Sequence, residues 1–186
     1  MLFQMGLEDD LKTLGHADVE AGNHTQQPDH SYQPKVLPYG RSSKWPSVVI
    51  ETGFAEQKTH LVKKTQWWIH QSEGDVRAVI TISVNQKVRE IILDHWHPVN
   101  RPTRGVPSRM VAESTQQVVI SQGAGDDASI KVENAPFVVP FSSFFLREPL
   151  PGKEADFRWT KEQLETLGKN VWEDHPRSRT TGSKVA

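Results

Sequence analysis

The stretch PSVVIET, residues 46–52, begins the part of the sequence that decides the fold. Its closely spaced β-branched residues, followed by Gly53, predict a strand, and a continuous apolar run of this kind is typical of a strand buried on both faces. The next stretch, AEQKTHLVKKTQWWIH at 55–70, contains neither Gly nor Pro and has helical spacing. Two further strands are predicted at 76–84 (VRAVITISV) and 88–97 (VREIILDHWH). This β–α–β–β order predicts a mixed sheet with helices packed on it.

Toward the N-terminus, residues 1–24 are expected to form a helix and a lead-in to the main domain. The apolar residues between Leu2 and Leu14 follow one helical face, and Gly15 would end that helix. The abrupt start of the sequence suggests that this helix is truncated. Prolines spread over residues 28–46 exclude a long helix there, so turns and short extended pieces are predicted.

Toward the C-terminus, the sequence predicts a loop followed by a β-rich segment. Residues 98–115 carry three prolines and are expected to form the loop. Short strands are predicted at 117–121 and 129–133. The stretch 136–146 is apolar but is interrupted by Pro140.

A last helix is predicted at 159–172. Thr160, followed by Gln163 three residues later, is typical of a capping box at the start of a helix. Residues 173–186 lack core-forming residues, so a disordered tail is expected. We therefore expect a single domain over 25–172.

The composition limits the classes of function. Lys and Arg together number 22 against 23 Asp and Glu, a net charge of −1, which argues against a strongly basic coat but permits a local basic groove. The absence of cysteine excludes disulfides, cysteine nucleophiles and cysteine-based zinc sites. The sequence has no apolar run of membrane-spanning length and no signal-peptide pattern. We therefore expect an intracellular protein, cytoplasmic or nuclear, with no membrane partner.

Charged residues in and around the first predicted strand are candidates for chemistry. Glu51 lies inside the strand, Asp29 follows Pro28 in a polar turn, and Lys63 and Lys64 lie on the next helix. A carboxylate in an apolar strand is costly unless it is paired or holds a cation. Two carboxylates, with water and phosphate oxygens, suit Mg²⁺, and a lysine can orient or deprotonate the attacking water. A simple ion pair between Glu51 and one of the two lysines is the alternative.

Several stretches together carry a resemblance to a known superfamily. They are QPDHSYQP (27–34), WPSVVIETGFAE (45–56), KKTQWWI (63–69), GDVRAVITISV (74–84), PFSSFFLREPL (140–150) and FRWTKEQLETLGKNVW (157–172). With these stretches the sequence resembles the PD-(D/E)XK nuclease superfamily, and within it a fungal group of uncharacterised restriction-endonuclease-like proteins. The resemblance covers most of residues 25–172, and its specific part is the combination of PD, a buried Glu and two adjacent Trp residues.

The resemblance implies a fold, an activity and a set of site residues. The fold is a restriction-endonuclease-like α/β core (mixed α+β), with a mixed four-stranded central sheet flanked by helices, to which this chain adds a C-terminal β-rich segment and helix. The activity is hydrolysis of phosphodiester bonds in nucleic acid with Mg²⁺, or Mn²⁺ in its place. Asp29 and Glu51 match the two metal-binding acids. Gly53 stands where the motif has its lysine, which some members carry on the following helix, where Lys64 or else Lys63 would serve.

Two other classes of function stay open from the sequence. One is a catalytically degenerate member of the same fold that binds nucleic acid or a protein without cutting. The other is an interaction domain in which Glu51 forms a structural ion pair.

Four further residues are secondary candidates. The resemblance implies another acid from an N-terminal helix, which would be Glu8 or Glu20. His95 and His97 place two imidazoles on one side of a predicted strand, an arrangement that a metal such as zinc can use.

Overall fold

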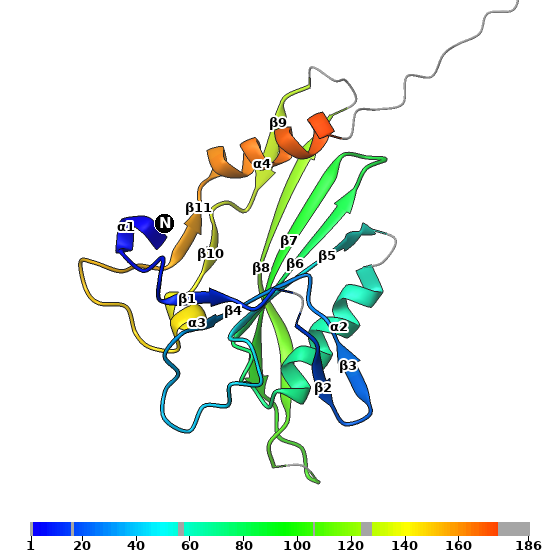
Figure 1. Cartoon of the computed structure of the whole chain (residues 1–186). Coiled ribbons are helices and arrows are strands. Elements are labelled where there is room, and N and C mark those ends of the chain that lie inside the picture. Colours follow the sequence, from blue (N-terminus) through cyan, green and yellow to red (C-terminus); the bar gives the residue numbers. More distant parts are fainter. Residues whose placement is uncertain (1, 16, 56–57, 106, 124–127, 175–186) are drawn as a thin grey trace, which may run out of the picture.

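The computed structural model describes residues 2–15, 17–55, 58–105, 107–123 and 128–174, and a seven-stranded sheet runs through it (Figure 1). In spatial order its strands are β1 (Leu11–Thr13), β4 (His30–Pro34), β5 (Val48–Phe54), β6 (Ala78–Asn85), β7 (Glu90–Asn100), β8 (Met110–Gln122) and β9 (Ile130–Glu133). β5 and β6 are parallel, and the other neighbouring strands are antiparallel. The predicted α+β class with a mixed central sheet is confirmed, although the sheet has seven strands where the resemblance implied four.

Helix α2 (Lys58–Gln71) connects the two parallel strands and packs on one face of the sheet (Figure 1). A parallel pair requires a crossover of this kind, because a tight turn cannot return the chain in the same direction. The buried residues of the helix recur at helical spacing and include Leu61, Thr65, Trp68 and Ile69. The predicted strand–helix–strand order is therefore confirmed, with element ends shifted by one to three residues.

A small core lies between α2 and the sheet. It includes Val49 and Val79, on neighbouring strands, together with Trp45 and Trp68. The ring of Trp68 meets those of Trp45 and Trp67 edge-on, at centroid distances of 6.3 and 5.0 Å. The two adjacent tryptophans therefore both take part in packing under α2. A hairpin of β2 (Val19–Ala21) and β3 (His24–Gln26) lies beside this helix (Figure 1).

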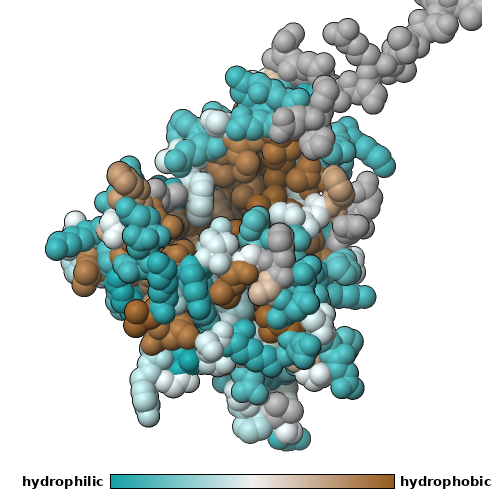
Figure 2. Space-filling view, in the orientation of Figure 1, coloured by the Kyte–Doolittle hydropathy of each residue, from teal (hydrophilic) through white to brown (hydrophobic). Residues whose placement is uncertain are grey.

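The opposite face of the sheet carries the larger core. It is covered by β10 (Phe137–Val139), α3 (Phe141–Phe145), β11 (Phe157–Trp159) and α4 (Lys161–Asp174). Figure 2 shows hydrophobic side chains gathered beside α4, and an apolar groove of about 410 Å³ lies between this helix, β11 and the sheet.

The predicted capping box at the start of α4 is confirmed. The Thr160 backbone N–H donates to Gln163 Oε1 at 2.9 Å, and the Gln163 N–H donates to Thr160 Oγ1 at 3.4 Å.

The expected N-terminal helix over residues 2–14 is wrong. The structure has one helical turn, α1 (Leu2–Met5), after which Gly6 adopts a φ of +67° and the helix ends. Leu11 to Thr13 then form β1, which pairs with β4. Apolar spacing suggested a helix, but the three residues of β1 gain hydrogen bonds by pairing with the edge of the sheet, and Phe3 of the expected apolar face stays 82% exposed.

The expected loop over 98–115 is shorter than predicted. β7 continues to Asn100 and β8 begins at Met110, and the two extensions pair with each other beyond a β-bulge next to Trp96. Pro98 fits within β7 because it lies past the last residue that pairs with β6, so its missing N–H removes no bond to that strand.

The C-terminal expectations are tested in part. Residues 175–186 of the predicted disordered tail lie outside the described residues, and Glu173 and Asp174 belong to α4. None of the described helices is long and apolar enough to span a membrane.

Candidate active site

Glu51 is fully buried in the middle of β5, on the face that α2 covers. Its Oε2 forms an ion pair with the ammonium of Lys64. Its Oε1 accepts a hydrogen bond of 2.7 Å from Trp68 Nε1. Both oxygens therefore have partners, which offsets the cost of burying a carboxylate.

Lys64 and Trp68 reach the same carboxylate because they lie one helical turn apart on α2. Trp68 is fully buried, whereas the side chain of Lys64 keeps 16% of its surface exposed. Its Nζ also lies 3.5 Å from the carbonyl oxygen of Gln27. Lys63, the other predicted lysine, is exposed. Of the two, Lys64 is the one that the structure brings to Glu51.

Asp29 comes to the same place through strand pairing. His30 of β4, the residue after Asp29, lies opposite Ile50 of β5, so the chain at Asp29 runs beside the middle of β5. The Oδ2 of Asp29 accepts hydrogen bonds from the backbone N–H of Thr52 at 2.6 Å and from its hydroxyl at 2.7 Å. The structure thus brings Asp29, Glu51 and Lys64 together from three separate elements.

The charges around Glu51 pull its pKa in both directions. Burial raises the pKa above its ordinary value of 4.5, and the hydrogen bonds from Lys64 and Trp68 lower it again. The nearby carboxylate of Asp29 raises it further. Two carboxylates facing one ammonium leave a surplus of negative charge, which favours a cation at this position.

Gly53, where the resemblance would place the motif lysine, lies under α2. A Cβ built on Gly53 would meet the side chain of Leu61 at 3.4 Å. The space beside this part of β5 is thus occupied by the helix, which also carries Lys64 to the site.

The sequence reasoning missed a second buried carboxylate on this face. Glu51 lies opposite Thr81 of β6, and Thr81 lies opposite Asp94 of β7, so the three side chains form a row across the sheet. Asp94 is 6% exposed and its Oδ1 accepts a hydrogen bond of 2.8 Å from Gln117. An Asp inside the apolar strand EIILDHWH is the same signal that singled out Glu51, and it could have been used.

The secondary candidates do not join the site. Glu8 precedes β1 and Glu20 lies on β2, and both side chains are exposed. Among the described residues, no group of three or more His, Asp or Glu side chains is placed to hold a metal ion. Asp29 and Glu51 thus stand as a pair of carboxylates, which still fits Mg²⁺ because this ion usually keeps several water ligands.

Comparison of the chain with protein-family models, curated proteins and solved structures gives no match. The site is therefore interpreted from its own geometry and chemistry.

Proposed function

We propose that this protein is a Mg²⁺-dependent nuclease of the PD-(D/E)XK type that hydrolyses phosphodiester bonds of nucleic acid. The observation that carries the proposal is the convergence of Asp29, Glu51 and Lys64. These residues come from the segment just before β4, the middle of β5 and α2. Asp29 and Glu51 match the two acids of the superfamily motif, and Lys64 matches the lysine that some members carry on the following helix. A structural ion pair between Glu51 and Lys64 would not need a second carboxylate that raises the pKa of Glu51.

The donor set suits a hard divalent cation. Asp29 and Glu51 would hold Mg²⁺, or Mn²⁺ in its place, with water and phosphate oxygens as the remaining ligands. A metal ion bound there stabilises negative charge on a phosphoryl oxygen and makes a bound water more acidic.

The other residues of the site have supporting roles in this proposal. Lys64 offsets negative charge beside Glu51, and its ammonium is the candidate to orient the attacking water. Trp68 holds Glu51 in one orientation through its indole N–H, and Thr52 does the same for Asp29 through two hydrogen bonds. Rigid placement of charged groups is the main contribution that a protein makes to phosphoryl transfer.

The arrangement of strands gives a second support. β1, β4, β5 and β6 are consecutive in the sheet, contain both parallel and antiparallel pairs, and carry α2 on one face. A mixed four-stranded sheet flanked by helices is the core that the resemblance implies.

One observation favours a second candidate, a catalytically degenerate binding module for nucleic acid. Both oxygens of Glu51 already have protein partners, Lys64 and Trp68. A carboxylate with two such partners can have a purely structural role, without binding a metal ion. The two candidates differ in whether metal binds and whether nucleic acid is cut.

The test is calorimetric titration with Mg²⁺ and Mn²⁺, alongside nicking of supercoiled plasmid, for the wild type and four variants. Asp29→Asn and Glu51→Gln remove the carboxylate charges while keeping the side-chain shape. Lys64→Met removes the ammonium, and Lys63→Met is the matched control on the same helix. We expect metal binding and nicking in the wild type and Lys63→Met, loss of both in Asp29→Asn and Glu51→Gln, and loss of nicking in Lys64→Met.

Other outcomes of these measurements would favour the two alternative functions, the binding module and the interaction domain. Salt-sensitive DNA binding by the wild type, with neither metal binding nor nicking, would overturn the catalytic proposal and favour the binding module. A wild type that binds neither metal nor DNA, with Glu51→Gln changing stability alone, would favour an interaction domain. Equal loss of nicking in Lys63→Met and Lys64→Met would contradict the specific role of Lys64.

A further inference from the structure

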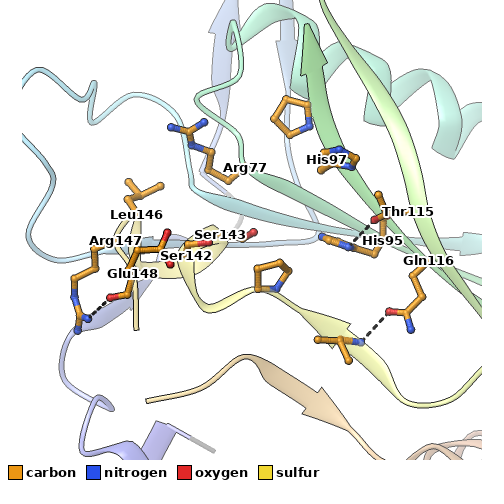
Figure 3. Close-up of a pocket in the computed structure, with 13 residues that line it drawn as sticks. Arg77, His95, His97, Thr115, Gln116, Ser142, Ser143, Leu146, Arg147 and Glu148 are labelled. Carbon is orange, nitrogen blue, oxygen red and sulfur yellow. Dashed lines mark hydrogen bonds between the residues drawn. The ribbon is translucent and has the colours of Figure 1, made fainter. Parts of the chain in front are cut away.

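Two histidines face a cavity on the side of the sheet opposite Glu51. His95 and His97 lie at alternate positions on β7, so both point to one face, while Trp96 between them packs into the core under α2. The cavity has a volume of about 810 Å³ and is also lined by residues of α3 and by Arg77 (Figure 3).

Each histidine has a ring nitrogen that is shielded from water and has no hydrogen-bond partner. These atoms are His95 Nε2 and His97 Nδ1. His95 as a whole is only 6% exposed. Leaving a buried polar nitrogen unpaired costs free energy, so two such atoms on neighbouring side chains of one strand face, beside a cavity, are candidate ligand atoms.

The other nitrogen of His95 is held by Thr115, on the neighbouring strand β8. Thr115 Oγ1 lies 3.0 Å from His95 Nδ1 and 3.3 Å from the carbonyl oxygen of His95. Because a hydroxyl carries one proton, donating it to the carbonyl leaves Oγ1 as the acceptor for the Nδ1–H. In that arrangement Nε2 carries a free lone pair. Figure 3 shows the contact between Thr115 and the imidazole of His95.

We propose that His95 Nε2 and His97 Nδ1 bind one divalent transition-metal ion of the zinc class, with water from the adjoining cavity completing its coordination. Imidazole nitrogens are preferred ligands of such ions, and a hydrogen bond to the second ring nitrogen of a ligand is a typical supporting contact. This proposal is independent of the proposed nuclease function, because its residues lie on the other face of the sheet.

The electrostatics of His95 agree with a neutral ligand. Burial, followed by the neighbouring His97, lowers the pKa of His95 from 6.5 to about 4. A neutral imidazole binds a metal without first losing a proton.

An anion is the alternative occupant of this cavity. A phosphate in its open part would meet the exposed Arg77, whereas the two unpaired ring nitrogens are buried beside it. With two histidine ligands, binding is expected to be weaker than in a four-ligand structural zinc site.

The test is Zn²⁺ titration of the untagged full chain by calorimetry, with excess Mg²⁺ present to occupy the carboxylates of Asp29 and Glu51. The variants are His97→Asn, His95→Asn and the control His24→Asn, an exposed histidine on β3. Co²⁺ absorption in the visible range gives a second readout, and because the chain has no cysteine, a change in that spectrum reports on nitrogen and oxygen ligands.

We expect one Zn²⁺ per chain in the wild type and the His24→Asn control, and a loss of affinity of about tenfold or more in both other variants. Circular dichroism identifies a variant that fails to fold. If the His95→Asn variant, which changes a buried position, fails to fold, the test still rests on His97→Asn, which changes the more exposed of the two positions. Absence of zinc binding by the wild type, or unchanged binding by folded His97→Asn, would overturn the proposal. Binding of inorganic phosphate that Arg77→Gln abolishes, without zinc binding, would identify an anion site instead.

Discussion

The two faces of the central sheet treat a buried ionisable group in opposite ways. On the α2 face, Glu51 is fully buried and each of its oxygens has a partner on the helix. On the other face, His95 is almost as deeply buried, yet its Nε2 has none. A carboxylate that is satisfied by its own protein contributes to the fold and is expensive to disturb. A buried imidazole nitrogen without a partner costs stability unless a ligand binds it. The comparison therefore distinguishes a site whose polar atoms are satisfied by the protein's own residues from one whose polar atoms need a ligand.

The largest effect on stability is expected from removing the ion pair between Glu51 and Lys64. Lys64→Met leaves the carboxylate of Glu51 buried without its counter-ion, and we expect a loss of about 3–5 kcal/mol in the free energy of unfolding. Chemical denaturation followed by tryptophan fluorescence measures this loss. The control Lys63→Met, at an exposed position on the same helix, should change stability by less than about 0.5 kcal/mol. Equal stability of the two variants would mean that Glu51 is not charged in the folded protein.

A smaller effect is expected from removing the second partner of Glu51. Trp68→Phe deletes the indole N–H that donates to Oε1 and also reduces packing, and we expect a loss of about 2–4 kcal/mol. Trp67→Phe is a matched control, because the buried Nε1 of Trp67 has no hydrogen-bond partner to lose. The difference between the two unfolding free energies measures the hydrogen bond to Glu51. If the two substitutions cost the same, the bond contributes nothing.

The opposite face can be tested through its packing. Gly168 of α4 lies against β8, and a Cβ built there would come within 2.8 Å of a methyl carbon of Ile120. Gly168→Ala should therefore destabilise the protein by about 1 kcal/mol, although alanine is the better helix former, because overpacking outweighs the gain in propensity. Thermal unfolding measures the change. Asn170→Ala, at an exposed position of the same helix, is the control and should be neutral or slightly stabilising. A stabilised Gly168→Ala variant would show that α4 packs more loosely than described.

The smallest expected effect is a pH dependence of stability that Glu51 supplies. The pKa of Glu51 is raised in the folded protein, chiefly by burial, so its contribution to stability is fully present below its ordinary pKa of 4.5. That contribution is lost as the pH rises through the folded-state pKa. The stability of Glu51→Gln relative to the wild type should therefore increase with pH across this window. Denaturation curves at several pH values from about 4 to 8 test this, and a constant difference would contradict the raised pKa.

The elements that the sequence predicted correctly are those with a strong local pattern. The apolar run in 46–52, the helical stripe through Leu61 and Trp68, and the capping box at Thr160 each depend on residues close together in the chain. The pattern at residues 2–14 was equally periodic, but it belongs to a short edge strand preceded by a single helical turn. Periodicity alone does not distinguish these outcomes when the segment is short and has a sheet edge to pair with.

The sequence indicated which types of residue form the candidate site, but it did not identify every residue that belongs to it. Glu51 was identifiable because an acid inside an apolar strand needs a partner, yet the same argument applies to Asp94 and was not made. Lys64 was preferred to Lys63 from the sequence, and the structure shows that Lys64 is the lysine that reaches Glu51. The unpaired nitrogens of His95 and His97 depend on the packing of β8 and α3 around β7, which no local pattern describes.

By itself, the sequence determined the order of the central strands and helix, and it placed a carboxylate in a buried strand and a lysine on the next helix. These features follow from local rules, since helical and strand periodicities repeat within a few residues. The tertiary structure decided that Asp29 bonds to Thr52, next to Glu51, that Lys64 reaches the carboxylate of Glu51, and that two histidines face a cavity. Strand register and side-chain burial arise from pairing between distant segments, so they are settled when the whole sheet assembles.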